Sequence, residues 1–234
     1  MIDIHCHILA GVDDGPVSLD DSLALARALV ADGVATVVAT PHIYESPLPV
    51  VTIETRRAEL LEKLSDANIR LEVLAGGENH YNVSLNDMAL YTLNAGRYLL
   101  LEFPPQTLPS AASEIVFSLR SRGLVPIIVH PERNAALLRD PLRLQSLLEQ
   151  GALTQLTAAS LVGDFGTEVR QCARYLLKKG MIHFLATDAH GASWRVPRLK
   201  AGLGEARKLI GCEKARCLVE EHPRRVIENQ PWPF

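Results

Sequence analysis

Aromatic side chains and cysteines are scarce in this chain. Only 5% of its 234 residues are Phe, Trp or Tyr, and there are four cysteines. The cysteines, at positions 6, 172, 212 and 217, show no C-x-x-C spacing. A chain of this length can bury a core of its own, so we expect neither a disulfide framework nor a thiolate metal site.

Long apolar runs and an excess of positive charge are also missing. The most apolar stretch, residues 23–40, contains Arg27 and Asp32, which excludes a membrane span. The opening residues, MIDIHCH, lack the basic and apolar regions of a signal peptide. The net charge of -3 argues against a nucleic-acid or anionic membrane partner. We therefore expect a cytoplasmic protein without membrane insertion or nucleic-acid binding.

Short β-branched runs alternate with longer amphipathic segments along the chain. Seven strands are predicted, over residues 1–5, 35–40, 70–75, 98–103, 125–130, 153–157 and 182–187. Such alternation is typical of parallel β/α folds, and near-continuous apolar strands indicate sheets covered on both faces. No Pro/Gly/Ser-rich linker divides the chain, and α/β barrels often run to about 200–250 residues as one unit. Residues 1–234 are therefore predicted to form one domain.

Helices are predicted between these strands. They begin at residue 19 and recur over 55–68, 110–123, 141–151, 168–180 and 197–211, with one more helix in the tail after residue 212. Ser18 and Asp21 have the spacing of a capping box at the first helix. Gly33 is expected to end that helix.

Acidic and imidazole side chains recur where the predicted strands end. In chain order they are His5 and His7, then His42, Glu78, Glu102 and His130, and finally Asp188 and His190. Only the sixth strand, residues 153–157, offers no such group. Ligands and catalysts collect beyond the carboxyl ends of parallel strands. A ring of these groups is electrostatically too costly for a packing device, and divalent cations are its natural counter-charge.

The first strand carries an H-x-H motif. Strand alternation places His5 and His7 on one face and Cys6 on the other, under a helix. With Asp13 or Asp14 added, the ring offers nine donors, which exceeds the coordination number of one ion. Nitrogen and oxygen donors without thiolate predict two or three ions of manganese, iron, zinc or magnesium.

Three further histidines are not part of this set. His183 and His222 are predicted to be structural, and the role of His80 stays open.

The motifs M-I-D-I-H-C-H, V-D-D-G-P, T-P-H, G-G-E, L-E-F, H-P-E-R and D-A-H follow one another over essentially the whole chain. Together they resemble the PHP superfamily (polymerase and histidinol phosphatase). Within it, the chain is most similar to the manganese-dependent tyrosine phosphatases of capsule and exopolysaccharide loci, the CpsB/CapC type. The resemblance implies an α/β fold, a distorted seven-stranded (β/α)7 TIM-like barrel, that holds three metal ions, manganese first among the candidates.

The resemblance also implies roles for individual residues. It assigns His5, His7, Glu78 and Asp188 to one metal, Glu78, Glu102 and His130 to a second, and Asp14, His42 and His190 to a third. Arg133 and Arg195 match the arginines that bind the substrate phosphate, and Asp188 or His190 is a candidate to assist the leaving group. Asn79 and His80 depart from the family pattern after the third strand, as does the loop 44–50. These departures affect substrate choice rather than the metals.

The activity implied is hydrolysis of phosphotyrosine by metal-activated water, with a bacterial tyrosine kinase as the partner. A cysteine nucleophile is excluded because none of the four cysteines is followed six positions later by arginine. Four alternatives stay open: a small-molecule phosphatase of the histidinol-phosphatase kind, a PHP module acting on nucleic-acid ends, a TatD-like deoxyribonuclease, and a non-catalytic, metal-bound regulatory partner of a kinase. The physiological substrate, the metal in the cell and the oligomeric state stay open as well.

Overall fold

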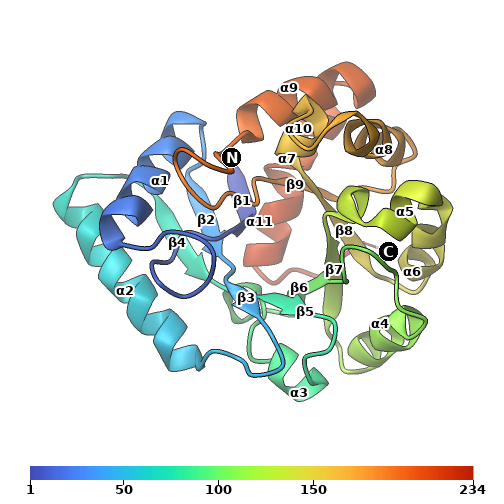
Figure 1. Cartoon of the computed structure of the whole chain (residues 1–234), viewed down its shortest axis with the longest axis horizontal. Coiled ribbons are helices and arrows are strands. Elements are labelled where there is room, and N and C mark those ends of the chain that lie inside the picture. Colours follow the sequence, from blue (N-terminus) through green and yellow to red (C-terminus); the bar gives the residue numbers. More distant parts are fainter. Residues whose placement is uncertain (234) are drawn as a thin grey trace.

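The computed structural model describes residues 1–233 and has parallel strands at its centre and helices around them (Figure 1). One sheet has the order β1-β2-β4 and the other the order β3-β5-β6-β7-β8-β9. Their bounds are β1 Ile2–Cys6, β2 Thr36–Ala39, β3 His42–Ile43, β4 Glu72–Ala75, β5 Glu78–His80, β6 Tyr98–Glu102, β7 Val125–Val129, β8 Leu153–Thr157 and β9 Phe184–Ala186. Every pairing between these strands is parallel, which confirms the predicted α/β class with parallel sheets.

Two chain segments pass from the first sheet to the second. Residues 40–41 lead from β2 into β3, and residues 76–77 lead from β4 into β5. Pro41 has no N–H to donate to a ladder, so β2 cannot continue through it unbroken. At Gly77 a Cβ atom would lie 2.7 Å from the Ile43 side chain, so the backbone bends there against a close neighbour. These breaks produce β3 and β5, which the hydrophobic pattern did not predict.

On the opposite side, β1 meets the chain beyond β9 in one bridge, between Cys6 and Ala189. The strands among residues 1–233 thus form two sheets rather than one continuous barrel, and seven-stranded closure remains a prediction.

Helices cover the outside of both sheets (Figure 1). They are α1 Leu19–Ala31, α2 Val50–Asp66, α3 Leu85–Met88, α4 Ala112–Ser121, α5 Ala135–Arg139, α6 Gln145–Glu149, α7 Ala158–Val162, α8 Thr167–Lys178, α9 Leu199–Ile210, α10 Cys212–Cys217 and α11 Glu221–Ile227. Short 3-10 turns lie at η1 Leu93–Ala95, η2 Pro131–Arg133 and η3 Pro141–Leu144. None of the helices within residues 1–233 combines the length and apolar character needed to cross a membrane.

The helix predictions hold in part. The capping box of α1 is present, because Ser18 accepts from the backbone N–H of Asp21 and Asp21 accepts from that of Ser18. Gly33 follows α1 with a φ of 92°, as a helix-ending glycine requires. However, α2 begins at Val50, earlier than predicted, and the tail holds two short helices, α10 and α11, instead of one.

Strand residues divide between two apolar clusters. One, the strand-centred apolar cluster, consists mostly of strand residues, such as Leu100 in β6 and Phe184 in β9, and also contains Val226 of α11. The other, the helix-facing apolar cluster, joins the alternate strand residues to the surrounding helices. Because side chains alternate along a strand, the first cluster is continued toward the carboxyl ends by polar groups such as Glu102 and Asp188. The fold therefore places the predicted ligands above one apolar layer.

Candidate metal centre

All of the predicted metal ligands meet at the carboxyl ends of the strands. Their donor atoms form four overlapping groups in which the atoms lie within 4.8 Å of one another. The groups are His7, Asp14, His42 and His190; His5, Glu78 and His130; His5, His7 and Asp188; and His42, Glu78 and Glu102. All but Asp14, His42 and Glu102 are buried. Residues distant in sequence thus form one compact donor cluster.

The H-x-H motif forms the deepest part of this cluster. The Nε2 atoms of His5 and His7 lie 3.4 Å apart, and Cys6 is buried in the helix-facing apolar cluster, as alternation predicts. Each Nε2 lies 3.4 Å from Oε2 of Glu78 and 3.5 Å from Oδ1 of Asp188. Two imidazole nitrogens and two carboxylate oxygens therefore converge on one small volume.

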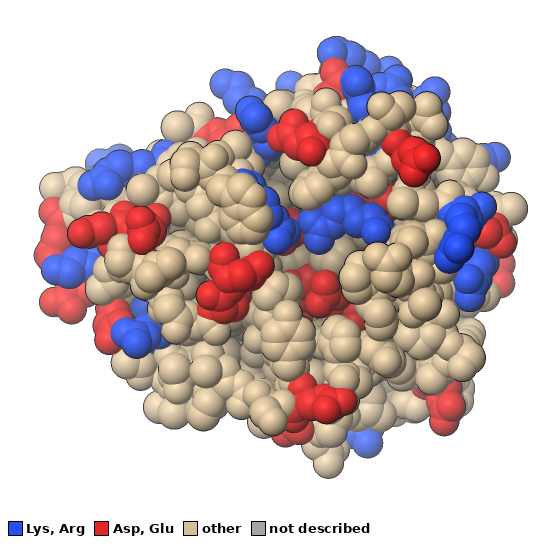
Figure 2. All heavy atoms as spheres, viewed as in Figure 1, with Lys and Arg blue, Asp and Glu red and all other residues tan. Residues whose placement is uncertain are grey.

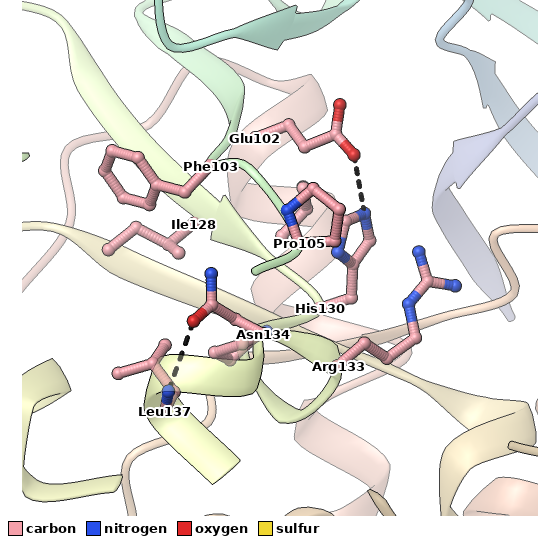
Figure 3. Close-up of a pocket in the computed structure, with 10 residues that line it drawn as sticks. Glu102, Phe103, Pro105, Ile128, His130, Arg133, Asn134 and Leu137 are labelled. Carbon is pink, nitrogen blue, oxygen red and sulfur yellow. Dashed lines mark hydrogen bonds and ion pairs between the residues drawn. The ribbon is translucent and has the colours of Figure 1, made fainter. Parts of the chain in front are cut away.

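Glu78 links this volume to a second group of donors. Its Oε1 lies 2.9 Å from Nε2 of His130, and its Oε2 lies 2.9 Å from Nδ1 of His42. Glu102 completes the group at 3.9 Å from His130, and Figure 3 shows these two side chains pointing toward each other. Since β5 supplies Glu78 and β6 supplies Glu102, neighbouring strands hold the two carboxylates side by side.

A third group of donors contains Asp14 and not its neighbour Asp13, a choice that the sequence alone left open. Oδ1 of Asp14 lies 3.4 Å from Nε2 of His42 and 3.2 Å from Nε2 of His190. Asp13 lies outside the donor groups and accepts a hydrogen bond of 2.6 Å from Nδ1 of His7. Asp14 is therefore placed as a donor to the cluster, whereas Asp13 orients a donor.

Charge and burial together shift the carboxylates of the cluster. Burial alone raises the pKa of Glu78, but the surrounding histidines, His5 foremost, lower it well below the usual value. Burial likewise raises the pKa of Asp188, but the charges of Arg133 and His5 outweigh it and hold this pKa well below its usual range. At Glu102, burial and the charge of Glu78 raise the pKa to about 7. Two carboxylates are thus held ionised in the interior.

The histidines divide into two groups. Burial lowers the pKa of His130 to about 4 and that of His190 to about 3, which leaves neutral imidazoles with lone pairs. Burial also lowers the pKa of His5 and His7, but neighbouring carboxylates such as Glu78 outweigh it and raise both. The deepest part of the cluster therefore favours positive charge.

Two orphaned oxygen atoms test whether metal ions fit this cluster. Oε2 of Glu78 and Oδ1 of Asp188 are buried and accept no well-oriented hydrogen bond from the described residues, although Nδ1 of His42 lies 2.9 Å from Oε2 of Glu78. Leaving a buried carboxylate oxygen without a partner is costly. Both atoms face His5 and His7, and oxygen with imidazole nitrogen is a donor set that divalent transition metals accept. The residues present therefore fit divalent ions.

Two arginines lie beside the cluster, at the positions expected for phosphate contacts. Oδ2 of Asp188 accepts a hydrogen bond of 2.6 Å from Arg133 and another from Arg195. Asp188 thus directs one oxygen to the histidines and the other to the arginines. Arg133 also lies over the ring of Phe165, with 4.9 Å from its Cζ to the ring centroid. These contacts hold both guanidinium groups next to the donors.

A hollow of about 320 Å³ opens above these groups. Arg133, Arg195 and Glu102 line it together with Tyr44 and Pro105. Figure 2 shows the same face of the molecule, where basic atoms lie along one side of a central hollow and acidic atoms along the other. An anionic group entering there meets cationic side chains next to the donor cluster.

The other histidines lie in different surroundings. His80 lines the hollow, at its edge near Tyr44. His222 donates from Nδ1 to the backbone carbonyl of His183, and His183 contacts Thr154, so both lie in a separate contact network. Neither His183 nor His222 belongs to any of the donor groups among residues 1–233.

Sequence reasoning missed one polar residue that touches the cluster. Gln155 of β8 accepts a hydrogen bond of 2.9 Å from Nδ1 of His5. Its signal in the sequence is a single amide among the leucines and threonines of that strand.

A family model described as "Capsular polysaccharide synthesis, CpsB/CapC" matches residues 1–228. The chain belongs to the CpsB/CapC family. This CpsB/CapC chain is 37% identical to the tyrosine-protein phosphatase YwqE of Bacillus subtilis, over 98% of this chain and 92% of YwqE. It is 31% identical to the tyrosine-protein phosphatase CpsB of Streptococcus pneumoniae, over 98% of this chain and 99% of that protein.

Solved structures agree with the family assignment. A crystal structure from work on YwqE and CpsB, described as unique metal-dependent tyrosine phosphatases, matches this CpsB/CapC chain with a TM-score of 0.94. It is 34% identical and covers 99% of this chain and 96% of that one. A β-aspartyl dipeptidase of Fervidobacterium islandicum matches with a TM-score of 0.58 at 13% identity, which shows a shared fold alone.

Proposed function

We propose that this CpsB/CapC protein is a metal-dependent protein-tyrosine phosphatase that hydrolyses phosphotyrosine without a cysteine intermediate. The observation that carries the proposal is the donor cluster with two arginines at its edge, inside a chain similar to named tyrosine phosphatases. Metal ions and cationic side chains side by side suit a dianionic phosphate ester. Cys6 is buried in the helix-facing apolar cluster, which does not suit a nucleophile.

The ligand assignment is part of this proposal. His5, His7, Glu78 and Asp188 hold one ion, Glu78, Glu102 and His130 a second, and Asp14, His42 and His190 a third, with manganese the first candidate and iron, zinc or magnesium the others. When bound, such ions supply Lewis-acid chemistry: they activate water and neutralise charge on the phosphoryl group. Glu78 would contribute to the first and second sets, and its two oxygens face different histidines: Oε2 lies 3.4 Å from Nε2 of His5, and Oε1 lies 2.9 Å from Nε2 of His130.

The arginines bind the phosphate in this proposal. The guanidinium groups of Arg133 and Arg195 are partly exposed in the hollow and offer planar pairs of donors to phosphate oxygens. Asp188 and His190 act by holding other groups in place. Asp188 is hydrogen-bonded to both arginines, and His190 donates from Nδ1 to the Asp188 carbonyl while its Nε2 faces Asp14.

The shape of the hollow supports an aryl ester over a small metabolite. Tyr44 and Pro105 line its wall, and the ring of Tyr44 stacks on His42 with 5.4 Å between ring centroids. A phenyl ring fits between such surfaces. The proposed partner is a phosphotyrosine protein, a bacterial tyrosine kinase of the capsule or exopolysaccharide system. A cytoplasmic location and a single domain with a closed seven-stranded barrel belong to the same proposal.

The test compares substrates on the purified full chain with Mn²⁺. We expect kcat/KM to be higher by about tenfold or more for a phosphotyrosine peptide than for histidinol phosphate. A chelator should abolish phosphate release, and His130→Ala should lower kcat by about 100-fold or more while the circular dichroism spectrum stays unchanged. His222→Ala is the matched control, because it removes a histidine outside the cluster.

Three results would each contradict part of the proposal. Turnover that persists in chelator or in His130→Ala refutes the metal-dependent mechanism. Preference for histidinol phosphate makes the protein a small-molecule phosphatase. Stoichiometric metal binding without turnover of any monoester makes it a non-catalytic regulatory partner.

A further inference from the structure

Gln155 is a fully buried polar residue in β8, a strand that carries no proposed ligand. Its register partners are Val129 in β7 and Phe184 in β9, both part of the strand-centred apolar cluster. An apolar side chain would match these neighbours and avoid the cost of burying an amide. Packing therefore does not explain why this position carries an amide.

The explanation is its contact with His5. Nδ1 of His5, which is itself fully buried, donates to Oε1 of Gln155 at 2.9 Å. The Nε2 atom of the amide has no partner among the described residues, so this bond is the one side-chain contact that compensates the burial. The free-energy cost of burying this amide is therefore explained by its hydrogen bond to His5, which orients the imidazole ring.

The direction of the bond fixes the chemistry of His5. An imidazole that donates its Nδ1 proton presents the lone pair of Nε2, and Nε2 is the atom that faces Glu78 and Asp188. With the opposite tautomer, an N–H group would point into the donor cluster and oppose a cation. Of the two neutral tautomers, the amide oxygen of Gln155 accepts from the one that binds metal and not from the other.

The backbone of the same residue supports a second donor. The carbonyl of Gln155 accepts from the backbone N–H of His130 at 2.8 Å. His130 has a φ of 36°, a left-handed conformation that is uncommon outside glycine. One residue of β8 thus contacts two histidines of the cluster.

We infer that Gln155 is a positioning residue that selects the Nδ1–H tautomer of His5 and thereby sets the affinity of the cluster for its deepest metal ion. This inference rests on the proposed metal role of His5. β8 therefore contributes a supporting residue to the centre without contributing a ligand.

The test titrates the metal-free full chain with Mn²⁺ and follows the free ion by electron paramagnetic resonance. We expect Gln155→Leu to weaken one site by about 10- to 100-fold. Gln155→Glu should restore near wild-type affinity because a carboxylate oxygen accepts the same proton. Thr154→Val is the matched control: it removes a buried hydroxyl from the same strand, where the partners are His183 and the Met181 carbonyl. Its Mn²⁺ affinity should equal that of the wild type.

A second readout does not depend on the metal. In the metal-free chain, nitrogen-15 spectra should show a slowly exchanging Nδ1 proton on His5, assigned by its loss in His5→Gln. We expect it in the wild type and in Gln155→Glu, and not in Gln155→Leu. If Gln155→Leu does not fold, Gln155→Met, which keeps the length of the side chain, replaces it in both measurements.

Wild-type Mn²⁺ affinity in a folded Gln155→Leu, or equal weakening in Gln155→Leu and Gln155→Glu, would overturn the inference. An unchanged Nδ1 proton in Gln155→Leu would overturn it too. Failure of the proposed metal centre looks different: the wild type would then bind none of the candidate ions, whereas the proton signal would still respond to Gln155.

Discussion

Tyr44 is a half-exposed residue where the hollow opens, and it lies against one of the proposed ligands. Its ring and that of His42 are inclined by 23°, a stacked arrangement, and His80 lies beyond it with 5.8 Å between centroids. Tyr44 and Arg133 line the same hollow, so we expect the ring of a phosphotyrosine whose phosphate reaches Arg133 to lie along this wall. Stacking between aromatic rings contributes about 1 kcal/mol beyond area burial. Tyr44 therefore affects which phosphate esters the site prefers.

Replacing Tyr44 by alanine tests this role. We expect Tyr44→Ala to lower kcat/KM for a phosphotyrosine peptide about five- to tenfold, because the phosphotyrosine ring loses the aromatic surface against which it stacks. Hydrolysis of a phosphoserine peptide, which has no ring, should not change. Phe117→Ala removes another exposed aromatic residue, from α4, and serves as the control in steady-state kinetics. An equal loss on both peptides would show that Tyr44 supports the metal ligands and not the substrate ring.

Single residues also show what the sequence could and could not predict. Side-chain chemistry at strand ends was enough to find the donors from His5 to His190, because parallel strands bring their carboxyl ends to one edge. It could not separate Asp13 from Asp14, which have the same chemistry and differ only in the direction that a turn gives them. It also missed Gln155, since an amide matters here only through a contact with a residue 150 positions away.

Among the elements, β8 was predicted at its observed bounds, and most other strands within one or two residues. The short strands β3 and β5 were missed because their pairing depends on chain breaks at Pro41 and at two glycines rather than on hydrophobic periodicity. Helix α7 was also missed because it is too short to show a hydrophobic period. It directly follows β8 and packs closely against α9.

The contact between α7 and α9 depends on one glycine. A Cβ atom on Gly202 would lie 2.7 Å from Cβ of Ala158 and 2.9 Å from its Cα, so a backbone would have to move. We expect Gly202→Ala to lower the free energy of unfolding by about 1–3 kcal/mol. In the same helix, a Cβ on Gly204 meets nothing within 4 Å, so Gly204→Ala should be neutral or raise stability by up to about 1 kcal/mol. Urea titrations of both variants measure the difference, and equal effects would refute the packing argument.

At the scale of the whole molecule, the donor cluster spans both sheets. His5 comes from β1 in the first sheet, whereas His42, Glu78 and Glu102 come from β3, β5 and β6 in the second. Apart from the chain segments that pass between them, the sheets meet where β1 contacts the chain after β9, through the bridge between Cys6 and Ala189 and a few hydrogen bonds such as that from the Asp188 N–H to the His5 carbonyl. Ions that bind donors from both sheets would join the sheets at a boundary that few hydrogen bonds cross. The proposed centre is therefore also a crosslink of the fold.

This arrangement predicts that metal removal destabilises the protein. A ligand that binds only the folded chain stabilises it by about 2.7 kcal/mol when its concentration is 100 times its dissociation constant. We expect the Tm of the wild type to rise with Mn²⁺ and to fall when a chelator is added, as measured by differential scanning calorimetry. His130→Ala should lose part of this Mn²⁺-dependent rise because one set of donors is incomplete. His222→Ala, which removes a hydrogen bond to the His183 carbonyl and no member of the donor groups, should lower Tm with and without Mn²⁺ yet keep the full rise. If Mn²⁺ leaves the Tm of the wild type unchanged at concentrations that saturate turnover, the ions act in catalysis without joining the two sheets.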